Sequence, residues 1–116
     1  MIYLQKKHQN GLSFIDHQTL AVSLADMATD IDAARLLTWK AASLIDRGMD
    51  SAKASSMCKV FAAEMAERIC SRAMQLLGAD GYVRECPLEK HLRDVRALSI
   101  YEGTNQAQRM VIASML

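Results

Sequence analysis

The apolar positions between residues 20 and 45 constrain the fold of this chain more than any other feature. They recur in steps of four and three residues, at Leu20, Leu24, Met27, Ile31, Ala34, Thr38, Ala41 and Ile45. Because an α-helix turns once in about 3.6 residues, this spacing places all of them along one helix face. The segment is therefore predicted to be a long helix that faces a partner.

A second segment, residues 51–77, has a wider apolar face made of two adjacent stripes. The first contains Met57, Phe61, Met65, Ile69 and Ala73, and the second contains Ala54, Cys58, Ala62, Ala66, Cys70 and Met74. A face of this width predicts a helix that is covered on more than one side. The single Pro and the eight Met of the chain also favour helices over strands.

Residues between the segments indicate where the helices begin and end. Gly48 and Gly78 can adopt the left-handed conformation that ends a helix. Pro87 suits the first turn of a third helix, and Thr104 suits the N-cap of a fourth. The predicted helices cover residues 16–47, 51–77, 87–100 and 104–115.

These helices predict an all-α fold, an antiparallel, up-and-down four-helix bundle with no sheet. We expect one domain over residues 1–116, with 51% apolar and 23% charged residues, as in a globular protein. Residues 1–9 are expected to be the tail of another helix. Residues 78–86, which read G-A-D-G-Y-V-R-E-C, are expected to be a loop.

Charge and cysteine content exclude several classes of function. Fourteen basic and thirteen acidic residues give a net charge of +1, so no basic surplus points to nucleic acid or to an anionic membrane. No uncharged run is long enough for a membrane span, and no signal-peptide pattern is present, so a cytoplasmic location is expected. Cys58 and Cys70 would lie about 18 Å apart along one helix and cannot bridge. Without a C-x-x-C motif or clustered histidines, no metal site is predicted, and the three cysteines are expected to be free thiols.

The turn Tyr101-Glu102-Gly103-Thr104 joins the last two predicted helices and contains a carboxylate. A Glu in a glycine-containing turn is ordinarily solvated. A turn between rigid helices could also hold a catalytic base against a substrate. The turn alone leaves both interpretations open.

Four motifs, in order along nearly the whole chain, carry a family resemblance. They are L-A-D-M-A-T-D-I-D-A-A-R-L-L at 24–37, Q-L-L-G-A-D-G-Y at 75–82, P-L-E-K-H-L-R-D at 87–94 and I-Y-E-G-T-N-Q-A-Q-R at 100–109. The sequence resembles the C-terminal helical domain of the acyl-CoA dehydrogenases. These flavoproteins use FAD to desaturate acyl-CoA thioesters between Cα and Cβ, in fatty acid metabolism.

The resemblance implies that Glu102 is the base that removes the α-proton of an acyl-CoA substrate. It also implies that Tyr101 and Gly103 lie beside that substrate, because a glycine lets a thioester approach the backbone. The resemblance favours the catalytic interpretation of Glu102 over a solvated turn.

Cofactor contacts are implied in the same way. Gln75, Gly78 and Ala79 match a Q-x-x-G-G-x-G stretch that contacts the dinucleotide of a neighbouring subunit, with Ala79 in place of the middle glycine. Thr104 and Gln106 match positions that contact the flavin. The alternative for Gln75 is a polar-face residue of a long helix, and the resemblance favours the cofactor contact.

The N-terminal segment departs further from the family pattern R-x-Q-F-G. Lys7 aligns with the Arg, Gln9 with the Gln, and Asn10 with the Phe. Lysine keeps the charge but loses the planar fork that grips a pyrophosphate at two points. A weaker grip on FAD is therefore expected from Lys7 and Asn10.

Members of the family place an all-helical domain and a β domain before this one, and both would help to enclose the flavin. We therefore expect the 116-residue chain to be inactive on its own. Three alternatives stay open from the residues: part of an acyl-CoA dehydrogenase, a non-catalytic remnant, or an oligomerisation or interaction module. The wide apolar face predicts a homo-oligomer, either a dimer or a tetramer.

Overall fold

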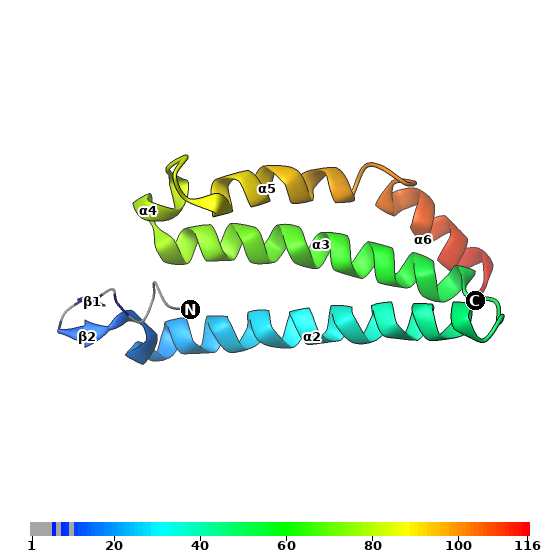
Figure 1. The fold of residues 1–116 in the computed structure, drawn as a ribbon, viewed down its shortest axis with the longest axis horizontal. Coiled ribbons are helices and arrows are strands. Elements are labelled where there is room, and N and C mark those ends of the chain that lie inside the picture. The colour runs from blue at the N-terminus through cyan, green and yellow to red at the C-terminus, as the bar shows by residue number, and fades with distance from the viewer. Residues whose placement is uncertain (1–5, 7, 10) are drawn as a thin grey trace.

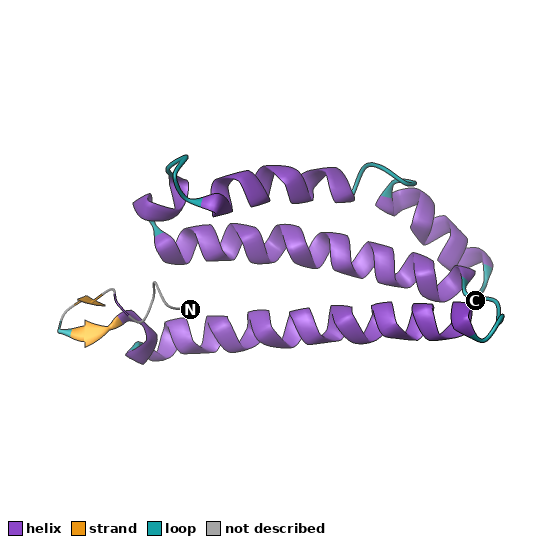
Figure 2. Cartoon of the chain, in the orientation of Figure 1, coloured by secondary structure: helices purple, strands orange, loops and turns teal. Residues whose placement is uncertain are grey.

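The computed structural model describes residues 6, 8, 9 and 11–116 of the chain. Helices dominate the described part (Figure 2). The elements are β1 (His8–Gln9), β2 (Leu12–Ser13), the 3-10 helix η1 (Phe14–Asp16), α2 (Gln18–Asp46), α3 (Ala52–Leu77), α4 (Ala79–Tyr82), α5 (Pro87–Leu98) and α6 (Asn105–Ser114). The all-helical class is confirmed, and each predicted helix agrees with an observed one to within two residues at either end.

Helix α3 is the centre of the fold. It packs against α2 on one side and against α5 and α6 on the other (Figure 1). Helices α5 and α6 lie one after the other along α3, on the side away from α2. The molecule is therefore elongated, with dimensions of 55 × 25 × 22 Å. The prediction that residues 51–77 form a helix covered on more than one side is confirmed.

Alanines contribute to the seam between the two long helices. Met27, Ala34 and Ala41 are buried at intervals of seven residues on α2, and Ala54 is buried on α3. Small residues at such positions let two helix backbones approach each other closely. Ion pairs flank the seam, because Arg68 contacts Asp30 at 2.7 Å and Arg72 contacts Asp26 at 3.9 Å.

The helix ends behave as their residues predict. Gly48 and Gly78 have φ of +64° and +63°, the left-handed conformation that ends α2 and α3. Pro87 begins α5, and the hydroxyl of Thr104 accepts a hydrogen bond from the amide of Ala107 at 3.2 Å. At the start of α3, the carboxylate of Asp50 accepts from the amide of Ala52 at 3.0 Å.

Two local features differ from the prediction. The stretch expected to be a loop contains the helical turn α4, whose Gly81 is buried. A Cβ at Gly81 would lie 2.8 Å from the Cβ of Leu77, so glycine is what allows this turn to fold back on α3. Near the N-terminus, β1 pairs with β2 in an antiparallel register around Gly11, which was not predicted. Most of the expected helix tail at 1–9 lies outside the described residues.

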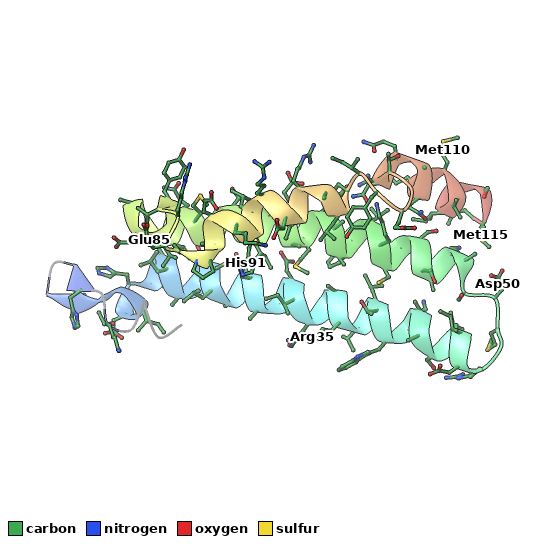
Figure 3. All side chains as sticks on the ribbon, turned by 45° about the horizontal axis from the view of Figure 1, so that its top comes forward. Arg35, Asp50, Glu85, His91, Met110 and Met115 are labelled. Carbon is green, nitrogen blue, oxygen red and sulfur yellow. The ribbon has the colours of Figure 1, made fainter. Side chains whose placement is uncertain are left out.

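Apolar side chains are also exposed away from the seam. On α2, Val22, Leu36 and Trp39 are largely exposed, and Trp39 is 65% exposed. Met110 of α6 is 74% exposed and points away from α3 (Figure 3).

Among the described residues, no helix combines the length and the apolar character that crossing a bilayer requires. Within the same part of the chain, no group of His, Cys, Asp and Glu side chains is arranged to hold a metal ion. The cysteines are free thiols, as predicted, and burial raises the pKa of Cys70. A raised pKa suits a packing residue rather than a nucleophile.

Candidate functional site

The turn between α5 and α6 has an unusual backbone. Glu102 has φ of +54°, the one positive φ of a non-glycine residue within the described part of the chain. Gly103 follows with φ of +83°. A left-handed conformation costs a residue with a Cβ about 1–2 kcal/mol, so other contacts must stabilise it.

Side chains from two helices stabilise this conformation. The amide nitrogen of Gln108 donates to the carbonyl of Glu102 at 3.2 Å, and Lys59 Nζ donates to the carbonyl of Gly103 at 2.8 Å. The hydroxyl of Ser56 donates to the amide oxygen of Gln108 at 2.8 Å. The turn is therefore attached to both α3 and α6.

Gly103 leaves room for a side chain of α6, which the sequence did not reveal. A Cβ at this position would lie 2.7 Å from Nε2 of Gln108. A larger residue would displace the end of the Gln108 side chain, which donates to the carbonyl of Glu102. The expectation that Gly103 admits a thioester stays a prediction.

Asn105 is the buried centre of the polar contacts around the turn, with only 3% of its surface exposed. Its amide oxygen accepts from Lys59 Nζ at 2.6 Å, and its amide nitrogen donates to Glu64 at 3.2 Å and to Ser99 Oγ at 3.4 Å. A buried amide with partners on both of its polar atoms is well satisfied. As the first residue of α6, Asn105 is thereby joined to α3 and to Ser99, the C-cap of α5.

Glu64 extends these contacts to the solvent. Arg109 donates to its carboxylate at 2.6 Å, and this hydrogen bond, together with the one from Asn105, holds the pKa of Glu64 below its usual value. A lowered pKa in the folded state means that the carboxylate stabilises the fold at pH values above the normal Glu pKa. That contribution is lost as the pH falls through the lowered value.

An apolar pocket of about 410 Å³ opens beside Glu102. Glu102 and Tyr101 line it from the turn, and Lys59 lines it from α3. The remaining walls are aliphatic and come from α3 and α5: Ala62, Ala63, Met65, Ala66 and Leu98. The carboxylate-bearing residue and the apolar surface are thus parts of one concave site.

The residues expected to contact a cofactor lie in two separate places. Thr104 and Gln106 line a second cavity of about 200 Å³ on α6, together with Glu67 and Arg96, whose side chains are paired at 2.9 Å. Gln75, by contrast, is exposed near the end of α3, about 12 Å along the helix from Glu67 at the standard rise, and it does not line that cavity. The chain does not bring the two groups together.

The opposite end of the molecule contains the other expected cofactor residues. Gly78 and Ala79 are exposed beside Gln75, and a Cβ at Gly78 would meet nothing within 4 Å. Strand β1, which contains Gln9, lies at the same end as α4 (Figure 1). Lys7 and Asn10 fall outside the described residues.

The sequence analysis missed the residues that hold the turn: Ser56, Lys59, Glu64, Asn105 and Gln108. A signal was present, because Asn105, Gln108 and Arg109 have the i, i+3, i+4 spacing of one helix face. Lys59 and Glu64 are likewise polar residues within a largely apolar helix. Both patterns resemble ordinary solvated positions, so the spacing alone does not select them.

Comparison with known proteins shows the family to which the chain belongs. Residues 1–116 match the family model described as acyl-CoA dehydrogenase, C-terminal domain. The chain is 45% identical to the mitochondrial short-chain specific acyl-CoA dehydrogenase of Rattus norvegicus, over 98% of the chain and 28% of that protein.

Solved structures agree. Butyryl-CoA dehydrogenase from Megasphaera elsdenii matches with a TM-score of 0.96 and 35% identity, over 98% of this chain and 30% of that one. The FAD complex of PigA matches with a TM-score of 0.94 and 26% identity, with the same coverage. The chain thus spans about 30% of the length of these relatives.

The fold is that of an all-helical domain in which the central helix α3 packs between α2 and the pair α5 and α6. The chain belongs to the acyl-CoA dehydrogenase family and corresponds to its C-terminal domain.

Proposed function

We propose that this chain is the C-terminal domain of an FAD-dependent acyl-CoA dehydrogenase, in which Glu102 removes the α-proton of an acyl-CoA. The observation that supports this most strongly is the position of Glu102, in a braced left-handed turn beside an apolar pocket. An acyl chain is apolar, and its thioester α-proton is weakly acidic. Its removal needs a carboxylate held within hydrogen-bonding reach and shielded from water.

The residues of the chain have defined tasks in this proposal. The aliphatic wall from α3 and α5 would bind the acyl chain and exclude water from the α-carbon. Glu102 would take the proton on its carboxylate, and Tyr101 and Gly103 would border the thioester. FAD, when bound, supplies the acceptor for the hydride that leaves Cβ.

The chain's donors fit FAD in two portions. Gln106 and Thr104 stand at the N-terminus of α6, where a polar cavity suits the hydrogen-bonding edge of a flavin ring. Gln75 offers an exposed amide next to the open backbone of Gly78, which suits a dinucleotide. Gln75 does not line that cavity and lies about 12 Å along α3 from Glu67, which does, so we propose that the two places serve two different FAD molecules in an oligomer.

A chimera tests the proposed function. Residues 1–116 would replace the matching 30% of Megasphaera elsdenii butyryl-CoA dehydrogenase. We expect the chimera to bind FAD and to reduce an electron-accepting dye when butyryl-CoA is added. The 116-residue chain by itself is expected to retain no FAD after gel filtration, because its cofactor residues are exposed and divided. A folded, FAD-loaded chimera without butyryl-CoA-dependent reduction would contradict the proposal.

A second candidate function, an oligomerisation module, is favoured by the exposed side of α2. On a helical wheel, Val22, Leu36 and Trp39 lie on the side opposite the buried Ala34, and all three are largely exposed. We expect the chain to form dimers or tetramers at tens of micromolar in sedimentation velocity experiments. Trp39→Glu should shift the distribution toward monomer, whereas Arg84→Glu, at an exposed position between α4 and α5, should not. A compact monomer of the unmodified chain would contradict this expectation.

A further inference from the structure

The backbone of the Glu102 turn is hydrogen-bonded on both sides of Gly103. Gln108 Nε2 donates to the carbonyl of Glu102 at 3.2 Å, and Lys59 Nζ donates to the carbonyl of Gly103 at 2.8 Å. These carbonyls belong to the two consecutive peptide groups that meet at Gly103. A hydrogen bond on each limits rotation of both peptide planes, and therefore limits the direction in which the Glu102 side chain leaves the backbone.

Both donors are themselves held in place by buried partners. The amide oxygen of Gln108 accepts from Ser56 Oγ, and Ser56 is only 5% exposed. With the oxygen engaged there, the amide nitrogen is turned toward Glu102. Lys59 Nζ also donates to the buried amide of Asn105 at 2.6 Å. The side chains of Lys59 and Gln108 are thus held in place by buried hydrogen-bond partners when they donate to the turn.

We propose that Lys59 and Gln108 are positioning residues for Glu102. They hold the turn in its left-handed conformation and thereby set the place of the carboxylate relative to the apolar pocket that Lys59 also lines. The proposal rests on the proposed role of Glu102 as base. A misplacement of about 1 Å can lower a catalytic rate about 100-fold, so loss of either hydrogen bond should affect turnover strongly.

The kinetic test uses the FAD-loaded chimera and three variants. Lys59→Met removes the donor to Gly103, and Gln108→Glu removes the donor to Glu102 while keeping an acceptor for Ser56. Lys53→Met is the matched control, because Lys53 is also on α3 and donates to a backbone carbonyl, that of Met115, at 3.2 Å. That carbonyl lies at the far end of α6 from the turn.

We expect kcat for butyryl-CoA to fall about 10- to 100-fold in Lys59→Met and in Gln108→Glu, with KM changed less than about threefold. The control should keep kcat within about twofold of the unmodified chimera. A purely structural role would lower the folded, FAD-loaded fraction while leaving kcat per FAD-loaded enzyme unchanged. A kcat within about twofold in both test variants, or an equal fall in the control, would overturn the proposal.

A second measurement tests the geometry without catalysis. The three-bond coupling between the amide and α protons of Glu102 reports φ, and it can be measured by NMR on the folded chimera or on the 116-residue chain. We expect the coupling to change in Lys59→Met and Gln108→Glu and to stay constant in Lys53→Met. An unchanged coupling in both test variants would overturn the proposal even if turnover fell. If Glu102→Gln kept full turnover, the base assignment would fail, yet this coupling would still decide whether the two residues hold the turn.

Discussion

In the FAD-loaded chimera, Glu102→Gln is expected to lower turnover of butyryl-CoA about 100- to 10,000-fold, the usual contribution of a positioned general base. Glutamine keeps the size of the side chain and its capacity to accept hydrogen bonds, but it cannot take up a proton. Because the hydrogen bonds that hold the turn go to the backbone carbonyls of Glu102 and Gly103, the substitution should leave the turn intact.

The matched control for this variant is Glu85→Gln. Glu85 is an exposed carboxylate between α4 and α5, and it does not line the apolar pocket beside Glu102. Its replacement should leave turnover unchanged, and FAD content, read from flavin absorbance, should be the same in both variants. Loss of FAD in Glu102→Gln would show that the residue supports the fold of the site rather than the proton transfer.

Asn105→Leu is expected to lower the free energy of unfolding of the chain by about 2–3 kcal/mol. Leucine has the same number and branching of side-chain heavy atoms as asparagine, so the substitution opens no cavity and its cost arises mainly from lost hydrogen bonds. Lys59, Glu64 and Ser99 would each lose a partner at a site where Asn105 is 3% exposed. Chemical denaturation followed by circular dichroism measures the change.

An exposed amide provides the comparison for that experiment. Gln18 is exposed at the first position of α2, and Gln18→Leu should change the free energy of unfolding by less than about 0.5 kcal/mol. Equal stability of the Asn105→Leu and Gln18→Leu chains would show that the buried contacts around the turn do not contribute to the fold.

Helices were predictable from this sequence because their signals are local. The four-and-three spacing from Leu20 to Ile45 requires only the geometry of one helix, and Gly48, Gly78, Pro87 and Thr104 mark ends through their own backbone preferences. The helical turn α4 was missed because glycine, here Gly81, is common in loops, so the segment was expected to be a loop. The close approach of Gly81 to Leu77 of α3, where an added Cβ would lie 2.8 Å away, involves residues that local turn preferences do not consider.

The candidate site was predictable only in part. A family resemblance selected Glu102, whereas the residues that hold its turn depend on contacts between distant segments. Lys59 is 44 positions from Gly103, and Ser56 is 52 positions from Gln108. Polar residues on long helices are ordinarily solvated, and nothing local distinguishes Lys59 from Lys53. The expectation that Gly103 makes room for a substrate stays a prediction, and the closeness of Gln108 to Gly103 was not predictable from the sequence.

Exchange of the substrate α-proton with solvent deuterium tests the role of Glu102 most directly, because it observes proton removal itself. Butyryl-CoA would be incubated with the FAD-loaded chimera in D₂O, and deuterium at Cα would be followed by NMR. The unmodified chimera and Glu85→Gln should incorporate deuterium at equal rates, and Glu102→Gln should be at least about 100-fold slower. Exchange at the same rate in Glu102→Gln would contradict the assignment of Glu102 as the base.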